Sequence, residues 1–211
     1  MRLMFVHGWG FDAGFWQRLV AHVPGWGWDA VDRGYFGARV APECAGPVLV
    51  VAHSFGAMQV LAAPPADCRG LVAINGFDRF VAGDGAAGVS ARVIARMVAR
   101  FAAEPGGVLG DFRQRCGWDA PFGALEPEIL GRDLQALAEQ DCRAQAAAAD
   151  FPILSVQGGA DPILPAAMRG AVFAGAGHVQ RLDVAGGGHV LPLSAPQLCA
   201  EAIRRFAERL A

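Results

Sequence analysis

The chain has 211 residues and a formal net charge of −2, and all 18 of its basic residues are arginine. This length predicts a single domain with a core of its own, and the nearly balanced charge gives no reason to expect a nucleic-acid or membrane partner. A hydrophobic fraction of 54% excludes a disordered or fibrous chain.

Apolar segments of strand length alternate with helical segments along the chain. Residues 3–6, 48–52, 70–75 and 152–157 are continuous apolar runs, which is typical of strands covered on both faces. Helical patterns at 13–23 and 54–63 end at prolines. A last helix is predicted over 194–210, with Ser194 as its N-cap and a proline in its first turn. This alternation predicts a parallel sheet with crossover helices.

Residues 78–150 interrupt the alternation. They contain helical patterns at 89–101, at the end of 106–117 and at 127–140, separated by Gly and Pro clusters, and they contain no convincing strand. We therefore predict one domain, in which residues 1–77 and 151–211 form the core and residues 78–150 form a helical insertion.

The cysteines give no sign of a disulfide framework or a zinc site, because their number is odd and no two form a CxxC pair. They are Cys44, Cys68, Cys116, Cys142 and Cys199. The apolar run after Arg2 is too short for a signal peptide, and no run approaches the roughly 18 residues that span a bilayer. We predict a soluble cytoplasmic protein without a metal or an organic cofactor.

The stretch VVAHSFGAMQ, residues 51–60, places a serine where a buried strand meets a helix. Such a junction with small residues around the serine, here Ala52 and Gly56 around Ser54, is typical of a nucleophile elbow. In this turn the strand and helix backbones crowd the serine, and its hydroxyl is exposed above the sheet. A serine that only caps a helix gives a similar local pattern, so Ser54 must be judged with other residues.

A serine nucleophile needs a base and an acid, which follow it in the order Asp, His in this type of site. Asp161 lies in SVQGGADPILP, directly after a predicted strand, and His189 lies in DVAGGGHVLPLSAP, before the last helix. Either residue alone is most simply a turn or loop residue. Together, in this order, they are predicted to be the partners of Ser54. Asp78 is an alternative acid, but the turn around Asp161 fits the pattern better.

Ester hydrolysis also needs backbone N–H groups that face the developing oxyanion. The residue after the nucleophile, Phe55, would supply one of them. The segment HGWG, residues 7–10, can supply the other from Trp9, because its glycines let the backbone turn toward the site. A plain strand-to-helix turn is the alternative interpretation of HGWG.

The segments HGWG, AHSFGA, GGADPILP and GGGHVLP together resemble the α/β-hydrolase fold family over nearly the whole chain. HGWGFDAGFW, NGFDRF, LEPEILGRDLQALAEQDCR and PILSVQGGADPILP look most like its pimeloyl-[acyl-carrier protein] methyl ester esterases of biotin synthesis. The resemblance implies an α/β fold with a mainly parallel sheet, helices on both faces and a helical lid over Ser54. Ala52 departs from the usual glycine, and because the chain begins at the strand before HGWG, we expect about six strands.

The resemblance further implies an acyl ester substrate, with methyl pimeloyl-carrier protein as the best match. Arg92, Arg96 and Arg100 share one side of a predicted helix, beside Val93, Met97 and Phe101. They could bind the phosphopantetheine phosphate and the acidic surface of an acyl-carrier protein, or they could form a solvated helix face. Other residues could line an acyl pocket or belong to the core: Phe77, Phe80, Trp118, Phe122, Val190 and Leu191.

The sequence thus predicts a serine hydrolase in which Ser54 attacks a carboxylic ester, His189 moves the proton and Asp161 orients the imidazole. Two alternatives stay open. One is a general short-chain carboxylesterase, thioesterase or lactonase that acts on free small molecules. The other is a non-catalytic binding protein with a hydrolase fold, since a fold does not guarantee activity.

Overall fold

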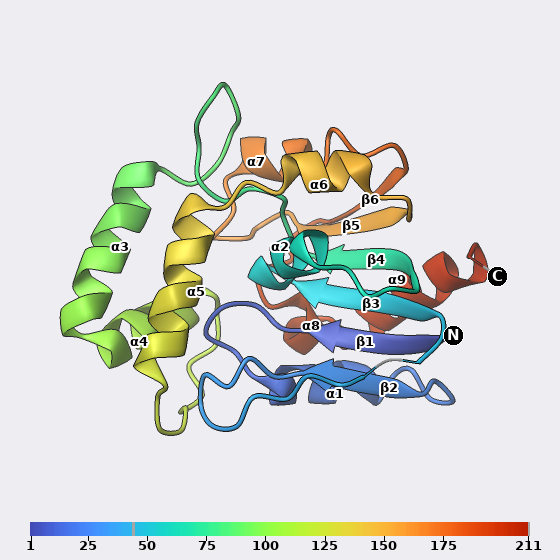
Figure 1. The fold of residues 1–211 in the computed structure, drawn as a ribbon, viewed down its shortest axis with the longest axis horizontal. Coiled ribbons are helices and arrows are strands. Elements are labelled where there is room, and N and C mark those ends of the chain that lie inside the picture. Colours follow the sequence, from blue (N-terminus) through green and yellow to red (C-terminus); the bar gives the residue numbers. More distant parts are fainter. Residues whose placement is uncertain (44, 211) are drawn as a thin grey trace.

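A computed structural model describes residues 1–43 and 45–210 of the chain, and its centre is one six-stranded sheet (Figure 1). The strands lie in the order β2-β1-β3-β4-β5-β6, and every neighbouring pair is parallel. Their bounds are β1 (Arg2–Val6), β2 (Trp28–Val31), β3 (Val48–His53), β4 (Cys68–Ile74), β5 (Ile153–Gly158) and β6 (Val179–Val184). The predicted parallel sheet of about six strands is confirmed.

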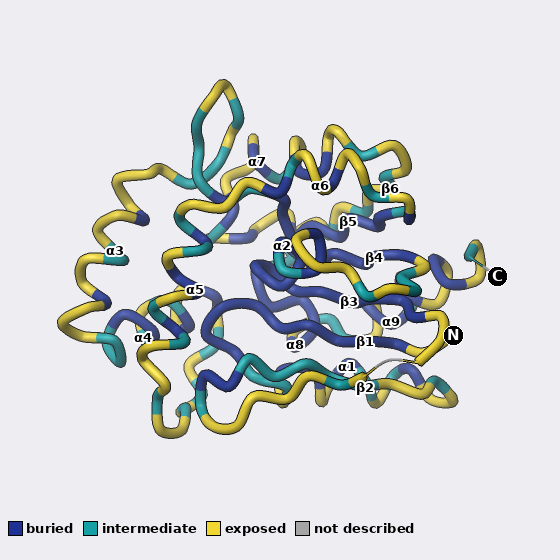
Figure 2. The backbone as a smooth tube through the Cα atoms, viewed as in Figure 1, coloured by how far each residue is buried: buried dark blue, intermediate teal, exposed yellow. Residues whose placement is uncertain are grey.

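Side chains from the two faces of the sheet form two separate cores. Leu3 and Phe5 point to one face and Met4 and Val6 to the other, as the two-residue period of a strand requires. The first face is covered by the short helices η1 (Ala13–Trp16), α1 (Gln17–Val20) and α8 (Leu191–Ser194) and by α9 (Pro196–Glu208). The second is covered by α2 (Phe55–Ala62), α6 (Arg143–Ala148) and α7 (Ala166–Ala171). Figure 2 shows that β1, β3 and β4 are buried along most of their length.

Three helices lie beyond the carboxyl ends of the strands, toward which the arrowheads in Figure 1 point. They are α3 (Ala91–Ala103), α4 (Pro105–Arg115) and α5 (Pro127–Glu139), and all of them come from the segment between β4 and β5. Buried side chains such as Ile94, Leu109 and Leu134 join them to the second core. The helical character predicted for residues 78–150 therefore corresponds to α3, α4, α5 and α6.

Two predicted helices differ in the structure. The helix expected over 13–23 consists of η1 and one further turn, and it ends at Val20. The helix expected from Ser194 is divided, because Ser194 ends α8 and Ala195 is the N-cap of α9. Pro196 explains the division, since a residue before proline avoids helical backbone angles, and Ala195 has φ −139°. Ser194 as the N-cap was therefore wrong.

Among the residues that the structure describes, no helix is long and apolar enough to cross a membrane. Four cysteines are free thiols in the described part of the chain, namely Cys68, Cys116, Cys142 and Cys199. Cys44 lies outside the described residues.

Candidate active site

Ser54 occupies a sharp turn between β3 and α2. Its backbone has φ 52° and ψ −126°, a conformation that costs a residue other than glycine free energy and is found at functional turns. The turn brings other backbone segments very close. A Cβ atom added to Gly56 would lie 2.5 Å from the Val6 carbonyl oxygen, and one added to Gly8 would lie 2.9 Å from Cβ of Ser54. Only glycine fits at these two positions, so the strained turn depends on them.

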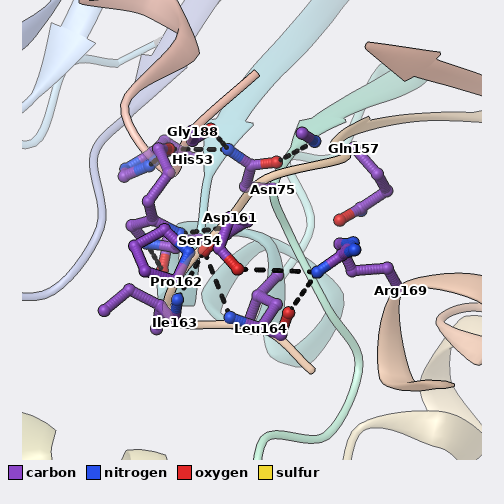
Figure 3. Close-up of polar contacts among 12 residues, drawn as sticks. His53, Ser54, Asn75, Gln157, Asp161, Pro162, Ile163, Leu164, Arg169 and Gly188 are labelled. Carbon is purple, nitrogen blue, oxygen red and sulfur yellow. Dashed lines mark hydrogen bonds and ion pairs between the residues drawn. The ribbon is translucent and has the colours of Figure 1, made fainter. Parts of the chain in front are cut away.

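The side chains of Ser54, His189 and Asp161 form a continuous hydrogen-bonded series (Figure 3). His189 Nε2 lies 3.1 Å from the Ser54 hydroxyl oxygen, and His189 Nδ1 lies 2.7 Å from a carboxylate oxygen of Asp161. The side chains of His189 and Asp161 are completely buried. Because the carboxylate accepts the proton on Nδ1, Nε2 is free to accept the serine proton.

The Asp161 carboxylate is fixed by its own loop. Its second oxygen accepts hydrogen bonds from the backbone N–H groups of Ile163 (2.7 Å) and Leu164 (3.1 Å). The Arg169 guanidinium donates to the carbonyl oxygens of Leu164 (2.5 Å) and Gly159 (2.8 Å), and so closes the loop from the α7 side. The loop thus presents one carboxylate oxygen to His189 and uses the other to hold its own shape.

Asp78, the alternative acid, lies elsewhere. Its carboxylate accepts the backbone N–H of Phe173 at 3.0 Å, and its carbonyl oxygen accepts that of Cys142 at 2.7 Å. Burial raises the pKa of the Asp78 carboxyl. Of the two acids, Asp161 is the one that contacts His189.

The two backbone N–H groups predicted for an oxyanion hole belong to buried residues, Trp9 and Phe55. Phe55 is the first residue of α2, where a backbone N–H has no acceptor within the helix. Within the described chain, neither N–H group donates a hydrogen bond to another protein atom. The Trp9 indole points away toward the helical insertion, where its N–H donates to the Leu130 carbonyl oxygen at 2.9 Å. Two unpaired backbone donors close to a buried serine are what a developing oxyanion requires.

A cavity of about 500 Å³ lies between α3, α4 and the loop that carries Asp161. Apolar side chains such as Val93, Ile94 and Met97 form much of its wall, and Arg96, Arg100, Arg115 and Arg169 also line it. Ser54 and His189 are not lining residues. Asp161 and Phe112 are lining residues that also contact His189, with 6.4 Å between the ring centroids of Phe112 and His189. The cavity therefore lies beside the Asp161 loop and Phe112, next to the buried hydrogen-bonded series.

Among the predicted substrate-binding residues, Phe80, Arg96 and Arg100 line this cavity. The remaining ones lie elsewhere: Phe77, Val190 and Leu191 are buried in the cores, Trp118 contacts the Arg18 guanidinium, Phe122 stacks on Phe36, and Arg92 is exposed on α3. Arg100 forms ion pairs with Glu104 (3.1 Å) and Asp111 (2.5 Å). Arg92 and Arg96 form none with the described residues, so two of the three arginines on this side of α3 are uncompensated cations.

Comparison with known proteins agrees with this architecture. A family model described as the alpha/beta hydrolase family matches residues 3–202. The chain belongs to this family.

The chain is also similar to curated proteins named pimeloyl-[acyl-carrier protein] methyl ester esterase. One from Yersinia pseudotuberculosis serotype O:1b (strain IP 31758) is 26% identical, over 98% of this chain and 93% of the relative. One from Xanthomonas axonopodis pv. citri (strain 306) is 28% identical, over 97% and 94%. A crystal structure of bromoperoxidase from Bacillus anthracis superposes with a TM-score of 0.82 at 17% identity, over 98% of this chain and 91% of that one. The last likeness supports the fold alone.

Two further residues of this alpha/beta hydrolase contact the His189 loop, although no role was predicted for either from the sequence: His53 lies in AHSFGA, and Asn75 is the first residue of NGFDRF. His53 Nε2 lies 3.0 Å from the His189 carbonyl oxygen, and the His53 ring lies 4.5 Å from the Phe15 ring between centroids. Burial and the neighbouring His189 hold the pKa of His53 well below its usual value, so its ring is neutral. Asn75, directly after β4, contacts the same loop. Their position could have indicated a role, because His53 ends β3 and Asn75 directly follows β4, at the carboxyl ends of strands next to the site.

Proposed function

We propose that this chain is a serine hydrolase that cleaves a carboxylic ester in two steps, through an acyl-enzyme. The observation that carries the proposal is the hydrogen-bonded series from the Ser54 hydroxyl through His189 to Asp161. Ser54 Oγ attacks the ester carbonyl while His189 Nε2 takes its proton and passes it to the leaving alcohol. Water then attacks the acyl-enzyme by the same route in reverse, and Asp161 stabilises the imidazolium that forms in each step.

The tetrahedral intermediate of each step carries a negative charge on the former carbonyl oxygen. The backbone N–H groups of Trp9 and Phe55 would donate to this oxygen, since no other protein acceptor in the described residues uses them. One such donor in a preorganised site contributes about 10²- to 10³-fold to kcat. Trp9 and Phe55 are held by a glycine-rich turn and a helix start, so these donors need no rearrangement during the reaction.

The substrate that the comparisons favour is a methyl ester of a pimeloyl chain on an acyl-carrier protein, as in the names of the similar curated proteins. A cavity of about 500 Å³ has the size of an ordinary small-molecule site, and its apolar wall suits an acyl chain. Helices α3, α4 and α5 would form the lid over it. Arg92 and Arg96 would face the acidic carrier protein, and a cytoplasmic location would give access to it.

The serine chemistry is tested by intact-mass spectrometry after incubation with a fluorophosphonate, together with p-nitrophenyl ester hydrolysis. Wild-type protein should gain one adduct, and Ser54→Ala should gain none and lose roughly 10⁶-fold in kcat. Ser155→Ala is the matched control, because Ser155 is also a buried serine but accepts its hydrogen bond from Gln157. An adduct that persists in Ser54→Ala, or a folded wild type that gains none, would refute the mechanism.

The carrier-linked substrate is tested by reversing charge on α3. The double variant Arg92→Glu and Arg96→Glu should lower kcat/KM for a carrier-linked methyl ester by at least about tenfold, because attraction between opposite charges speeds encounter. Hydrolysis of a small p-nitrophenyl ester should not change. Arg204→Glu is the control, since Arg204 lies on α9, which covers the first face of the sheet, and not on the helices beyond the strand ends. Equal rates on the carrier substrate for the double variant and the wild type would favour an esterase of free small molecules.

A further inference from the structure

Asn75 connects two loops of the proposed active site through its buried side chain. Its Nδ2 group donates hydrogen bonds to the carbonyl oxygens of Gly188 (2.9 Å) and His189 (2.6 Å), and its Oδ1 atom accepts one from the backbone N–H of Gly158 (2.7 Å). Figure 3 shows this amide between the His189 loop and the end of β5. Gly158 is the last residue of β5, and the chain reaches Asp161 three residues later. One carboxamide therefore fixes the segment that carries the base against the strand that leads to the acid.

The contacts of Asn75 require a donor at one end of the side chain and an acceptor at the other. A carboxamide provides both, whereas a carboxylate would turn an acceptor toward two carbonyl oxygens. An apolar side chain would leave the Gly158 N–H and the Gly188 carbonyl oxygen without this partner, and the His189 carbonyl oxygen with His53 alone. The backbone of Asn75 has φ 45°, in the left-handed region that asparagine tolerates better than most residues. Both the polarity and the backbone conformation of this position suit asparagine.

The His189 loop depends on contacts from outside, because Gly186, Gly187 and Gly188 precede the histidine and glycine restricts the backbone least. The His189 carbonyl oxygen receives two side-chain hydrogen bonds, one from Asn75 and one from the neutral His53 ring. These donors come from the carboxyl ends of β4 and β3, so the sheet itself holds the backbone of His189. Its imidazole is then left to contact Ser54 and Asp161.

We infer that Asn75 is a positioning residue that sets the place of the His189 imidazole between the Ser54 hydroxyl and the Asp161 carboxylate. This inference rests on the proposed hydrolase function, because only a proton transfer makes the place of the ring matter for a rate. No hydrogen bond joins Asn75 to Ser54 or to Asp161 in the described chain, so it acts through the backbone of the histidine loop.

Two variants separate this role from a general contribution to stability. Asn75→Gly suits the left-handed backbone and removes the carboxamide, and Asn75→Asp keeps the shape but replaces the donor by an acceptor. Each should lower kcat about 10- to 100-fold, with KM within about twofold of the wild type, since misplacing a reacting group by about 1 Å can cost 10²-fold. Measuring both also covers the case in which one variant fails to fold.

Gln157→Ala is the matched control. Gln157 is a buried amide on the neighbouring strand, and its Nε2 group donates to the Gly76 carbonyl oxygen and the Ser155 hydroxyl, both at 3.0 Å. It forms no hydrogen bond with the His189 loop. The control should lose stability in urea unfolding as the Asn75 variants do, yet keep the wild-type kcat. If Gln157→Ala loses as much kcat as the Asn75 variants at equal stability, or if a folded Asn75 variant keeps the wild-type kcat, the inference is wrong.

A second readout does not depend on substrate. The His189 Nδ1 proton, bonded to a buried carboxylate, should give a far-downfield proton NMR resonance in the wild type. This resonance should shift or broaden in both Asn75 variants and stay unchanged in Gln157→Ala. If the wild type hydrolyses no ester but the resonances follow this pattern, the proposed function is wrong and the positioning of His189 by Asn75 still holds. If the resonance is unchanged in the folded Asn75 variants, Asn75 does not position His189, and the proposed function is unaffected.

Discussion

Replacing Gly56 by alanine tests how closely α2 must approach β1 for Ser54 to keep its conformation. A Cβ atom at this position would lie 2.5 Å from the carbonyl oxygen of Val6 and 2.8 Å from that of His7. Both oxygens belong to the backbone, so neither can rotate away from the new methyl group. The start of α2 must move instead, and Ser54 is the residue immediately before it.

The size of this movement follows from the contact distances. Ordinary contacts of a Cβ atom begin at 3.4 Å, so relief of the closest contact needs a displacement of about 1 Å. Overpacking of this kind costs about 1–3 kcal/mol, and the better helix propensity of alanine returns at most about 1 kcal/mol. We therefore expect Gly56→Ala to lower the free energy of unfolding by up to about 3 kcal/mol. A serine displaced by a similar distance should lower kcat by up to about 10²-fold.

Urea unfolding and hydrolysis of a p-nitrophenyl ester measure the two effects. Gly110→Ala is the matched control, because Gly110 lies within α4 and a Cβ atom there would meet no atom within 4 Å. That substitution should raise the free energy of unfolding by up to about 1 kcal/mol and leave kcat unchanged. If Gly56→Ala were as stable as Gly110→Ala and hydrolysed ester at the wild-type rate, the close approach of α2 to β1 would not be needed for the serine turn.

Two further predictions concern buried groups near the site. Burial lowers the pKa of His7 and His53, so below the usual histidine pKa of about 6.5 the unfolded chain takes up protons that the folded chain does not. The free energy of unfolding should therefore fall as pH decreases from 7 to 5, by up to about 1.4 kcal/mol per pH unit for each histidine, as measured by urea unfolding. A flat profile would mean that these rings are protonated in the fold. Trp9→Phe removes the indole donor and leaves the Leu130 carbonyl oxygen without it. This variant should lose about 1–3 kcal/mol of stability together with kcat, and an unchanged unfolding midpoint would show that this contact does not hold α5 in place.

The strands that the sequence predicted are those with both faces covered. Residues of β3 and β5 are all buried, and a continuous apolar run reports this condition directly. The edge strand β2 pairs only with β1 and has no buried residue, so its segment WDAV has no such run. Pairing with β1 decides its structure, and this pairing depends on contacts that a local pattern does not contain.

The site shows the same division between local and non-local information. Ser54 was predicted from the small residues around it at a strand-to-helix junction, and Asp161 and His189 from their order in the chain after it and the position of Asp161 directly after a strand. The contacts of Asn75 with the His189 loop join residues more than 100 positions apart, and no local spacing indicates them. The sequence pattern predicted the helices between β4 and β5, but not which side chains of each helix are buried. Val93, expected in the apolar stripe of α3, is 49% exposed at the cavity, whereas Ile94 is 3% exposed.

The anchoring of the inserted helices limits which of them can move to admit a substrate. Helix α5 is tied to the core through Leu130, which accepts the Trp9 indole N–H, and through Asp133, which accepts hydrogen bonds from Tyr35 (2.7 Å) and Arg33. Breaking one side of a fully buried ion pair costs about 3–5 kcal/mol, and here Asp133 is buried while Arg33 is partly exposed. Moving α5 would also pull on the loop that holds Trp9, the proposed oxyanion donor.

Helix α3 has no comparable anchor among the described residues. Only Ile94 and Phe101 of its side chains are buried, and it packs against α4 and α5 rather than against the sheet. It also carries Arg92 and Arg96, the cations that would meet a carrier protein, and forms one wall of the cavity. Because only two side chains of α3 are buried and its displacement breaks no buried ion pair among the described residues, we expect α3 to move if the cavity widens, on the side where the proposed partner would bind.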